Sequence, residues 1–275
     1  MVWPPPLELM RLVAPVSWPP KLELTRELRR RHGRAGWTPS VSSAGGQATA
    51  ERATEPFIIA LDGPAASGKS SVGLGTAREL GFGYFDTGLL YRMLTWLALE
   101  LGVNTSDAER LAELVDHLDI DVDPMGRVFR GQADLTEQLQ QPAVDAAVSE
   151  VSAHPRVRDA LRPAQRALIR PPGLVMAGRD IGTVIVPEAP LKIWLSASPE
   201  ERARRRSRQT GEPFERVLKG MRRRDRLDAS RDAAPMARAL DAVVVDTTGV
   251  APEDVIKRIV DLARGRGASS LKSRV

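Results

Sequence analysis

The segment from Gly63 to Ser71 places the strongest constraint on what this 275-residue chain can fold into. It fits the pattern G-x-x-x-x-G-K-[ST] at every fixed position and reads Gly63-Pro64-Ala65-Ala66-Ser67-Gly68-Lys69-Ser70-Ser71. In such a loop the glycines let backbone N–H groups curl around a phosphate, and the lysine reaches the terminal phosphates. The hydroxyl of Ser70 is placed to bind Mg²⁺. We therefore expect these residues to bind a nucleoside triphosphate, with Lys69 acting in catalysis.

The residues around this loop predict an α/β fold. Phe57–Leu61 is a short apolar run typical of a buried strand, and Gly83–Phe85 reads as a second strand. A helix is predicted after it, because apolar residues recur there at helical spacing: Leu90, Met93, Leu94, Leu97 and Leu101. Further strands are predicted at Leu191–Leu195 and Ala242–Asp246. Strands that alternate with helices predict a three-layer α/β/α P-loop NTPase fold with a central parallel sheet.

Composition excludes several classes of protein. The chain has no Cys, so it has no disulfide, thiolate nucleophile or Cys-ligated metal. No apolar run approaches the ~18 residues of a membrane span, so we expect no membrane partner. The net charge of +5 is concentrated in residues 1–54, which carry 8 Lys and Arg against 4 Asp and Glu. The remaining residues are nearly neutral, so we expect no nucleic-acid partner.

Residues 1–54 differ in composition from the rest of the chain. They contain the proline clusters Pro4–Pro6 and Pro19–Pro20, the basic run Arg29–Arg31, and a stretch rich in Ser, Gly and Ala. Such a sequence buries too little apolar surface to offset chain entropy. We interpret it as a disordered basic extension, with a basic tethering arm as the alternative. Residues 266–275 are expected to form a frayed tail.

Three motifs besides the loop identify a family that the chain resembles. They are Asp86-Thr87-Gly88-Leu89-Leu90-Tyr91-Arg92, Gly178-Arg179-Asp180-Ile181-Gly182-Thr183, and Arg223-Arg224-Asp225-Arg226-Leu227-Asp228-Ala229-Ser230-Arg231. With them the chain resembles the bacterial cytidylate (CMP) kinases from about Phe57 to about Leu262. The resemblance implies a monomeric, cytoplasmic enzyme that transfers phosphate from ATP to CMP or dCMP with Mg²⁺. It also implies a kinase domain over 55–265, with a CMP-binding insert at about 104–172 and a moving lid at about 200–222.

The same resemblance implies how the CMP side of the site is divided. The CMP phosphate is assigned to three arginines, of which the first two are also catalytic: Arg92, Arg179 and Arg231. Thr87 is assigned to CMP binding. The sugar is assigned to Arg224 and Asp228, and the cytosine to Ser149, Arg158 and Asp180. Taken alone, Arg92 reads as a solvated surface charge, Ser149 as a solvent-facing residue and Asp180 as a structural cap.

The chemistry of Asp180 supports its assignment independently. A carboxylate only accepts hydrogen bonds, and cytosine offers a 4-amino donor where uracil has a carbonyl. A site that pairs with the amino group would therefore discriminate against UMP.

The lid is predicted from a dense basic stretch. Residues 200–232 hold 12 Lys and Arg against 7 Asp and Glu, on both sides of a turn-like break at Gln209–Pro213. Although a charge run is usually a solvated helix face, mobile arginines that close over ATP would stabilise the transferring phosphate. We expect Arg202 and Arg205 to face ATP, with Arg206 as the alternative to Arg205.

Short sequence signals predict further local features of the fold. A capping box at Ser106–Glu109 predicts a helix start, and a hairpin is predicted between Asp119 and Leu135. Pro163 is expected to kink or restart a helix. The family commonly has Ile/Leu-Arg-[Ser/Thr]-Pro-Glu-Val where this chain reads Leu139-Gln140-Gln141-Pro142-Ala143-Val144.

The competing functions are a uridylate or shikimate kinase and, from another class, a nucleotide-dependent RNA-binding module.

Overall fold

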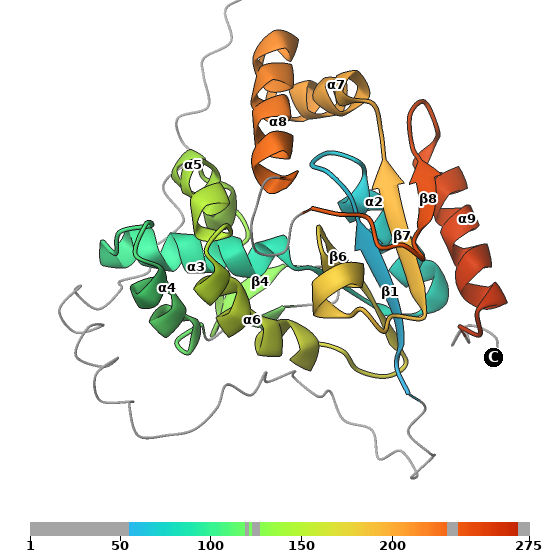
Figure 1. Cartoon of the computed structure of the whole chain (residues 1–275), viewed down its shortest axis with the longest axis horizontal. Coiled ribbons are helices and arrows are strands. Elements are labelled where there is room, and N and C mark those ends of the chain that lie inside the picture. Colours follow the sequence, from blue (N-terminus) through green and yellow to red (C-terminus); the bar gives the residue numbers. More distant parts are fainter. Residues whose placement is uncertain (1–54, 119–120, 123–126, 230–235, 269–275) are drawn as a thin grey trace, which may run out of the picture. The chain divides into compact units, whose positions relative to one another are not determined.

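The computed structural model describes residues 55–118, 121–122, 127–229 and 236–268 (Figure 1). Four predictions therefore fall outside the described residues. These are the extension at 1–54, the hairpin turn at 124–126, the role of Arg231, and the part of the tail beyond residue 268.

Five parallel strands form the central sheet, in the order β2-β6-β1-β7-β8. Their bounds are β1 Phe57–Asp62, β2 Gly83–Asp86, β6 Gly173–Gly178, β7 Leu191–Ser196 and β8 Val243–Asp246. The central strand β1 lies between β6 and β7, and Asp62 at its end is level with Gly178 and Trp194. Each strand predicted from an apolar run is present, within a residue or two of the expected bounds.

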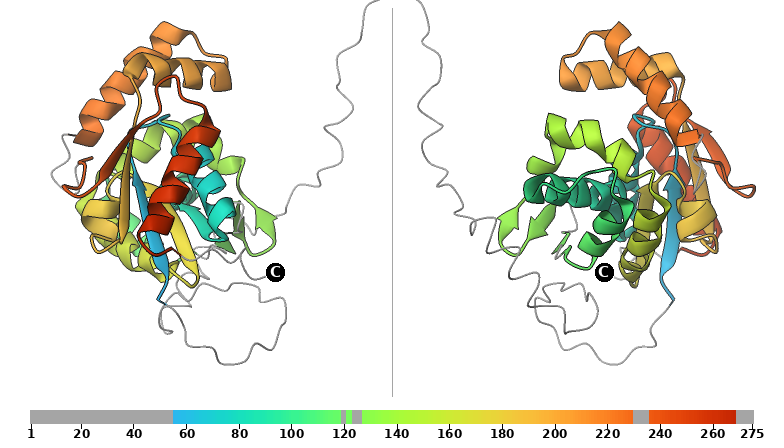
Figure 2. Two further views of the ribbon diagram at one scale, coloured as in Figure 1. Left: turned by 90° about the vertical axis from the view of Figure 1, so that its right-hand side faces the viewer. Right: turned by 60° about the vertical axis from the view of Figure 1, so that its left-hand side comes forward.

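Helices cover both faces of this sheet, as a three-layer fold requires (Figures 1 and 2). Side chains alternate along β1, so Ile58 and Ala60 belong to one core, and Ile59 and Leu61 belong to the other. The first core includes α3 (Gly88–Leu101) and the helices of the insert. The second includes α2 (Lys69–Leu80) and α9 (Pro252–Gly265). Because both faces of β1 are buried, its sequence is a continuous apolar run.

The segment between α3 and β6 contains the expected hairpin and a helical bundle. Its elements are α4 Ala108–Val115, β3 Asp121–Val122, β4 Val128–Arg130, β5 Ala133–Asp134, η2 Gln138–Gln140, α5 Pro142–Val151 and α6 Pro155–Ala167. The capping-box prediction is wrong by one residue, because Asp107 and not Ser106 accepts the hydrogen bond from the N–H of Arg110. Helix α6 continues through Pro163 without restarting.

Two helices follow β7 and lie beyond the carboxyl ends of the strands (Figure 1). Helix α7 (Pro199–Thr210) begins with Ser198 as N-cap, and α8 (Phe214–Ala229) follows the short break at 211–213. A small apolar cluster joins the two helices, and Arg202 of α7 forms an ion pair with Asp225 of α8 at 2.7 Å. No helix in the described ranges is long and apolar enough to cross a membrane.

Candidate active site

The motifs predicted to bind substrate meet at the carboxyl edge of the sheet. The phosphate-binding loop follows β1, Thr87 follows β2, and Arg179 and Asp180 follow β6. Ligands of open α/β sheets bind in the crevice outside this edge. The fold therefore places the predicted ATP and CMP motifs on adjacent strands.

The loop between β1 and α2 has a conformation suited to phosphate binding. Gly63 and Gly68 have φ angles of +152° and +99°, and a Cβ on Gly63 would lie 2.2 Å from the carbonyl oxygen of Leu195. The Nζ of Lys69 donates to the carbonyl oxygens of Gly63 at 2.7 Å and Pro64 at 2.8 Å. A phosphate bound in the loop would offer this ammonium charged oxygens in exchange for the two carbonyls.

The residues at the start of α2 fit a metal ion that arrives with the nucleotide. Ser70 and Ser71 lie in its first turn, and both are exposed. Mg²⁺ in ATP sites takes one or two protein oxygens and completes its shell with phosphate oxygens and water. Within the ranges that the structure describes, no group of three or more His, Asp or Glu residues could form a separate metal site. The hydroxyl of Ser70 stays the predicted metal ligand.

Asp62, the last residue of β1, joins the phosphate-binding loop to the loop after β6. Its Oδ1 accepts a hydrogen bond from the N–H of Ile181 and its Oδ2 from the N–H of Gly182, each at 2.8 Å. The residue is 5% exposed. Burial raises the pKa of its carboxyl from 3.8 to about 6, although the two N–H donors and Lys69 act in the opposite direction. Asp62 was not predicted from the motifs. Its signal in the sequence is its position as an acidic residue at the end of an apolar strand.

Arg158 and Asp180, both predicted cytosine contacts, form a buried ion pair. The guanidinium of Arg158 also donates to the carbonyl oxygen of Ser152 at 3.0 Å and lies over the ring of Tyr91, 5.3 Å from its centroid. Asp180 occupies the N-cap position of the short helical segment Ile181–Ile185, but its side chain makes no capping hydrogen bond there. The structure thus brings together an acceptor and a donor from two distant motifs.

Arg92 is held in place by α5 and the turn before it. Its Nη1 donates to the carbonyl oxygen of Leu139 at 2.7 Å, and its Nη2 contacts Oδ1 of Asp145 at 2.5 Å. The Arg92 side chain is 21% exposed, so it is not the solvated surface charge of the alternative interpretation. Asp145 was not predicted, because nothing in the sequence indicates which arginine its carboxylate meets.

The loops after β2 and β6 approach each other closely beside Arg179. Thr87 donates through its hydroxyl to the carbonyl oxygen of Ala177 at 3.0 Å, and a Cβ on Gly178 would lie 2.8 Å from that hydroxyl oxygen. Glycine at 178 therefore allows the two motifs to pack together. The Nη1 of Arg179 lies 3.5 Å from the sulfur of Met236.

Two arginines of α7 reach the phosphate-binding loop and its surroundings. Arg202 is buried and donates to the carbonyl oxygen of Ala65 at 3.3 Å. Arg205 donates to the hydroxyl of Thr247 at 2.9 Å, and its Nη1 lies 3.8 Å from where a Cβ on Gly68 would be. This geometry places Arg205 beside the loop, whereas Arg206 forms an ion pair with a residue of α5.

The binding roles of the four remaining predicted residues stay predictions. Ser149 lies half-buried on α5. Arg224 and Asp228 belong to α8, but their side chains are outside the described structure, as is the whole of Arg231.

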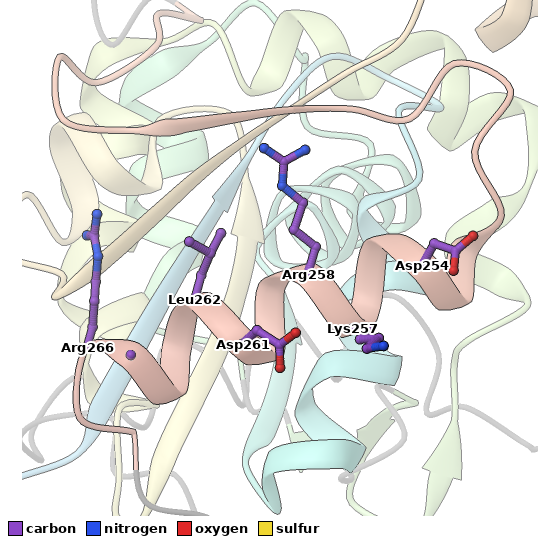
Figure 3. A pocket seen from close by; sticks show the side chains of 7 residues that line it. Asp254, Lys257, Arg258, Asp261, Leu262 and Arg266 are labelled. Atoms are coloured by element: carbon purple, nitrogen blue, oxygen red, sulfur yellow. The ribbon is translucent and has the colours of Figure 1, made fainter.

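A groove of about 600 Å³ lies along α9, away from the predicted site residues (Figure 3). Acidic and basic side chains line it together: Asp254, Lys257, Arg258, Asp261 and Arg266, with Leu262 and Gly265. It contains none of the motif residues, so we do not assign the active site to it.

Comparison with known proteins identifies relatives over most of the chain. Residues 59–265 match the family described as Cytidylate kinase. The chain is 44% identical over 219 residues to the cytidylate kinase of Mycobacterium leprae, which covers 78% of this chain and 98% of that protein. It is also 44% identical over 216 residues to the cytidylate kinase of Geobacillus kaustophilus, with coverage of 76% and 96%.

Solved structures are more distant. TT1252 from Thermus thermophilus is 22% identical, with a TM-score of 0.42 over 78% of this chain and 99% of that chain. Shikimate kinase from Acinetobacter baumannii in complex with shikimate is 16% identical, with a TM-score of 0.40 over 77% and 95%.

Proposed function

The chain belongs to the cytidylate kinase family, and we propose that it transfers the terminal phosphate of ATP to CMP or dCMP through the residues described above. The products are ADP and CDP or dCDP. The observation that carries this proposal is the contact that Asp62 makes between the end of β1 and the turn at Gly178–Thr183. Direct transfer requires adjoining donor and acceptor sites, and this contact holds the two motifs side by side.

On the ATP side, the backbone of the loop and Lys69 bind the phosphates, and Arg202 and Arg205 approach from α7. Ser70 would hold Mg²⁺, which supplies charge neutralisation at the phosphates when bound. The three cationic side chains then stabilise the charge that spreads over the transferring group.

On the acceptor side, the buried pair of Arg158 and Asp180 supports recognition of cytosine. Asp180 accepts from the 4-amino group, and Arg158 donates to the neighbouring ring acceptors. Uracil presents a carbonyl to Asp180 and an N–H to Arg158, so neither side chain can form its hydrogen bond with uracil. Ser149 completes the base site in this proposal, and Arg224 and Asp228 contact the sugar.

The CMP phosphate is bound by Arg92, Arg179 and Arg231, with Thr87 at the start of α3. The reaction requires no general base, because the attacking group is an ionised phosphate oxygen. The arginines align that oxygen with the terminal phosphate of ATP and offset the repulsion between the two anions. A cytoplasmic location and a monomeric state belong to the same proposal.

The test is a coupled assay of ADP production with Mg²⁺-ATP and a panel of acceptors. We expect CMP and dCMP to be phosphorylated with a kcat/KM at least about 100-fold above that of UMP, since two buried polar groups would be mispaired. AMP, GMP and shikimate should be poorer still. Faster turnover of UMP or shikimate would replace this proposal with one of the competing functions.

A further inference from the structure

Side chains from three helices meet at Asp145, in the first turn of α5. Its Oδ1 lies 2.5 Å from Nη2 of Arg92 on α3, and its Oδ2 lies 3.7 Å from Nη2 of Arg206 on α7. The insert and the lid helix are therefore joined through one carboxylate. In Figure 2 the lid helices α7 and α8 stand opposite α5, beyond the carboxyl ends of the strands.

The two contacts are unequal in distance and in burial. Arg92 is close to Asp145 and mostly buried, whereas Arg206 is more distant and 43% exposed. Asp145 itself is 35% exposed, and its two carboxylate oxygens already face the two different arginines. Ala143 stands two residues earlier, where the family commonly has Glu, and this leaves Asp145 as the acidic residue in the first turn of α5.

A phosphate bound at Arg92 would change which of the two arginines Asp145 contacts more strongly. The CMP phosphate carries up to two negative charges, and a carboxylate on the same guanidinium repels it at short range. The phosphate therefore weakens the contact between Asp145 and Arg92, and Arg206 is the other cation within reach of the released carboxylate.

We propose that Asp145 is a positioning residue that couples CMP binding to the lid by exchanging Arg92 for Arg206. This inference rests on the proposed function, because the CMP phosphate is what displaces Asp145 from Arg92. Arg206 lies on the same helix as Arg202 and Arg205, so a tighter contact with Asp145 restrains the helix that carries both arginines of the ATP side. Binding of CMP then favours binding of ATP, and the reverse follows by linkage.

The test compares the Kd for CMP with and without a non-hydrolysable ATP analogue and Mg²⁺, by calorimetry on the full chain. In the wild type we expect the analogue to tighten CMP binding at least about fivefold, the lower end of typical allosteric coupling. Asp145→Asn and Arg206→Met should each reduce this factor to below about twofold. The double variant should lose no more than either single variant, because both changes remove one contact.

Two further variants separate coupling from a merely structural role. Asp145→Glu keeps the charge and should retain part of the coupling. Asp159→Asn makes the same change of charge at an exposed ion pair on α6, so it should keep the full factor. Wild-type coupling below twofold, or full coupling in Asp145→Asn, would overturn the inference while CMP phosphorylation stands. A wild type that neither binds nor phosphorylates CMP would overturn the proposed function as well.

Discussion

Replacing Asp62 by Asn should change how the stability of the protein depends on pH. The carboxylate is buried at the end of β1 and accepts two backbone hydrogen bonds at 2.8 Å. An Asn side chain has nearly the same shape but cannot ionise between pH 5 and pH 8. Its single oxygen replaces only one of the two carboxylate oxygens, so one of the two N–H groups faces an NH2 donor and loses its acceptor, which costs about 1–3 kcal/mol at every pH in this range.

The size of this pH dependence of stability follows from the pKa of Asp62, which burial raises from 3.8 to about 6. Because the folded chain binds this proton more tightly than the unfolded chain, the resulting stability is fully present below pH 3.8 and is lost as the pH rises through 6. The two pKa values differ by an amount worth about 3 kcal/mol in the free energy of unfolding. About 1.4 kcal/mol of it is lost between pH 5 and pH 8.

The assay is urea unfolding of both proteins at pH 5, 6, 7 and 8, followed by circular dichroism. Relative to Asp62→Asn, the wild type should lose about 1.4 kcal/mol of unfolding free energy across this range. The exposed Asp159→Asn variant serves as the control and should follow the wild type. A difference between wild type and Asp62→Asn that stays constant to within about 0.4 kcal/mol would refute a raised pKa at Asp62.

Three further changes test the site and the chain before it. Lys69→Ala should lower kcat by several orders of magnitude with little change in Tm, and more than about a tenth of wild-type activity would contradict the role of the loop. Asp180→Ala should lower the CMP/UMP ratio of kcat/KM by about 10–100-fold, because it removes a charged hydrogen bond worth about 1.5–3 kcal/mol. An unchanged ratio with weakened ATP binding would place Asp180 on the metal side instead. Deletion of residues 1–54 should leave kcat and KM within about twofold by the same assay, because their composition supports no packed core. A large loss of activity or of Tm would contradict this.

Four of the five strands of the sheet were predictable because their signal is local, whereas β6 (Gly173–Gly178) was not predicted. Phe57–Leu61 is apolar on both faces, and each face packs into a different core, so the sequence pattern and the burial agree. The motifs could be recognised because each is a short continuous pattern, although the contacts that require glycine at 63 and 178 come from other segments, Leu195 and Thr87. The helix start at 106–109 was misplaced by one residue, because Ser106 and Asp107 can both cap a helix and only the fold selects Asp107.

The partners of charged side chains could not be predicted in this way. Asp62 and Gly182 are far apart in the sequence, and so are Arg92 and Asp145. Each pair forms because parallel strands or packed helices bring the residues together, and either acidic residue alone reads as an ordinary surface charge. An acidic residue that ends a buried strand is the one signal that a search restricted to motifs overlooks.

The two unpredicted carboxylates have different effects because of where they lie. Asp62 is level with Gly178 and Trp194 on the neighbouring strands, so its two hydrogen bonds join loops whose spacing the sheet already fixes. Asp145 instead joins helices outside the sheet, where α7 is connected to the core through the end of β7 and through side-chain contacts. A change at Asp62 should therefore act on stability first, because the sheet resists displacement. A change at Asp145 should act on the dependence of one substrate on the other, because its contact with α7 can be exchanged without unpairing a strand.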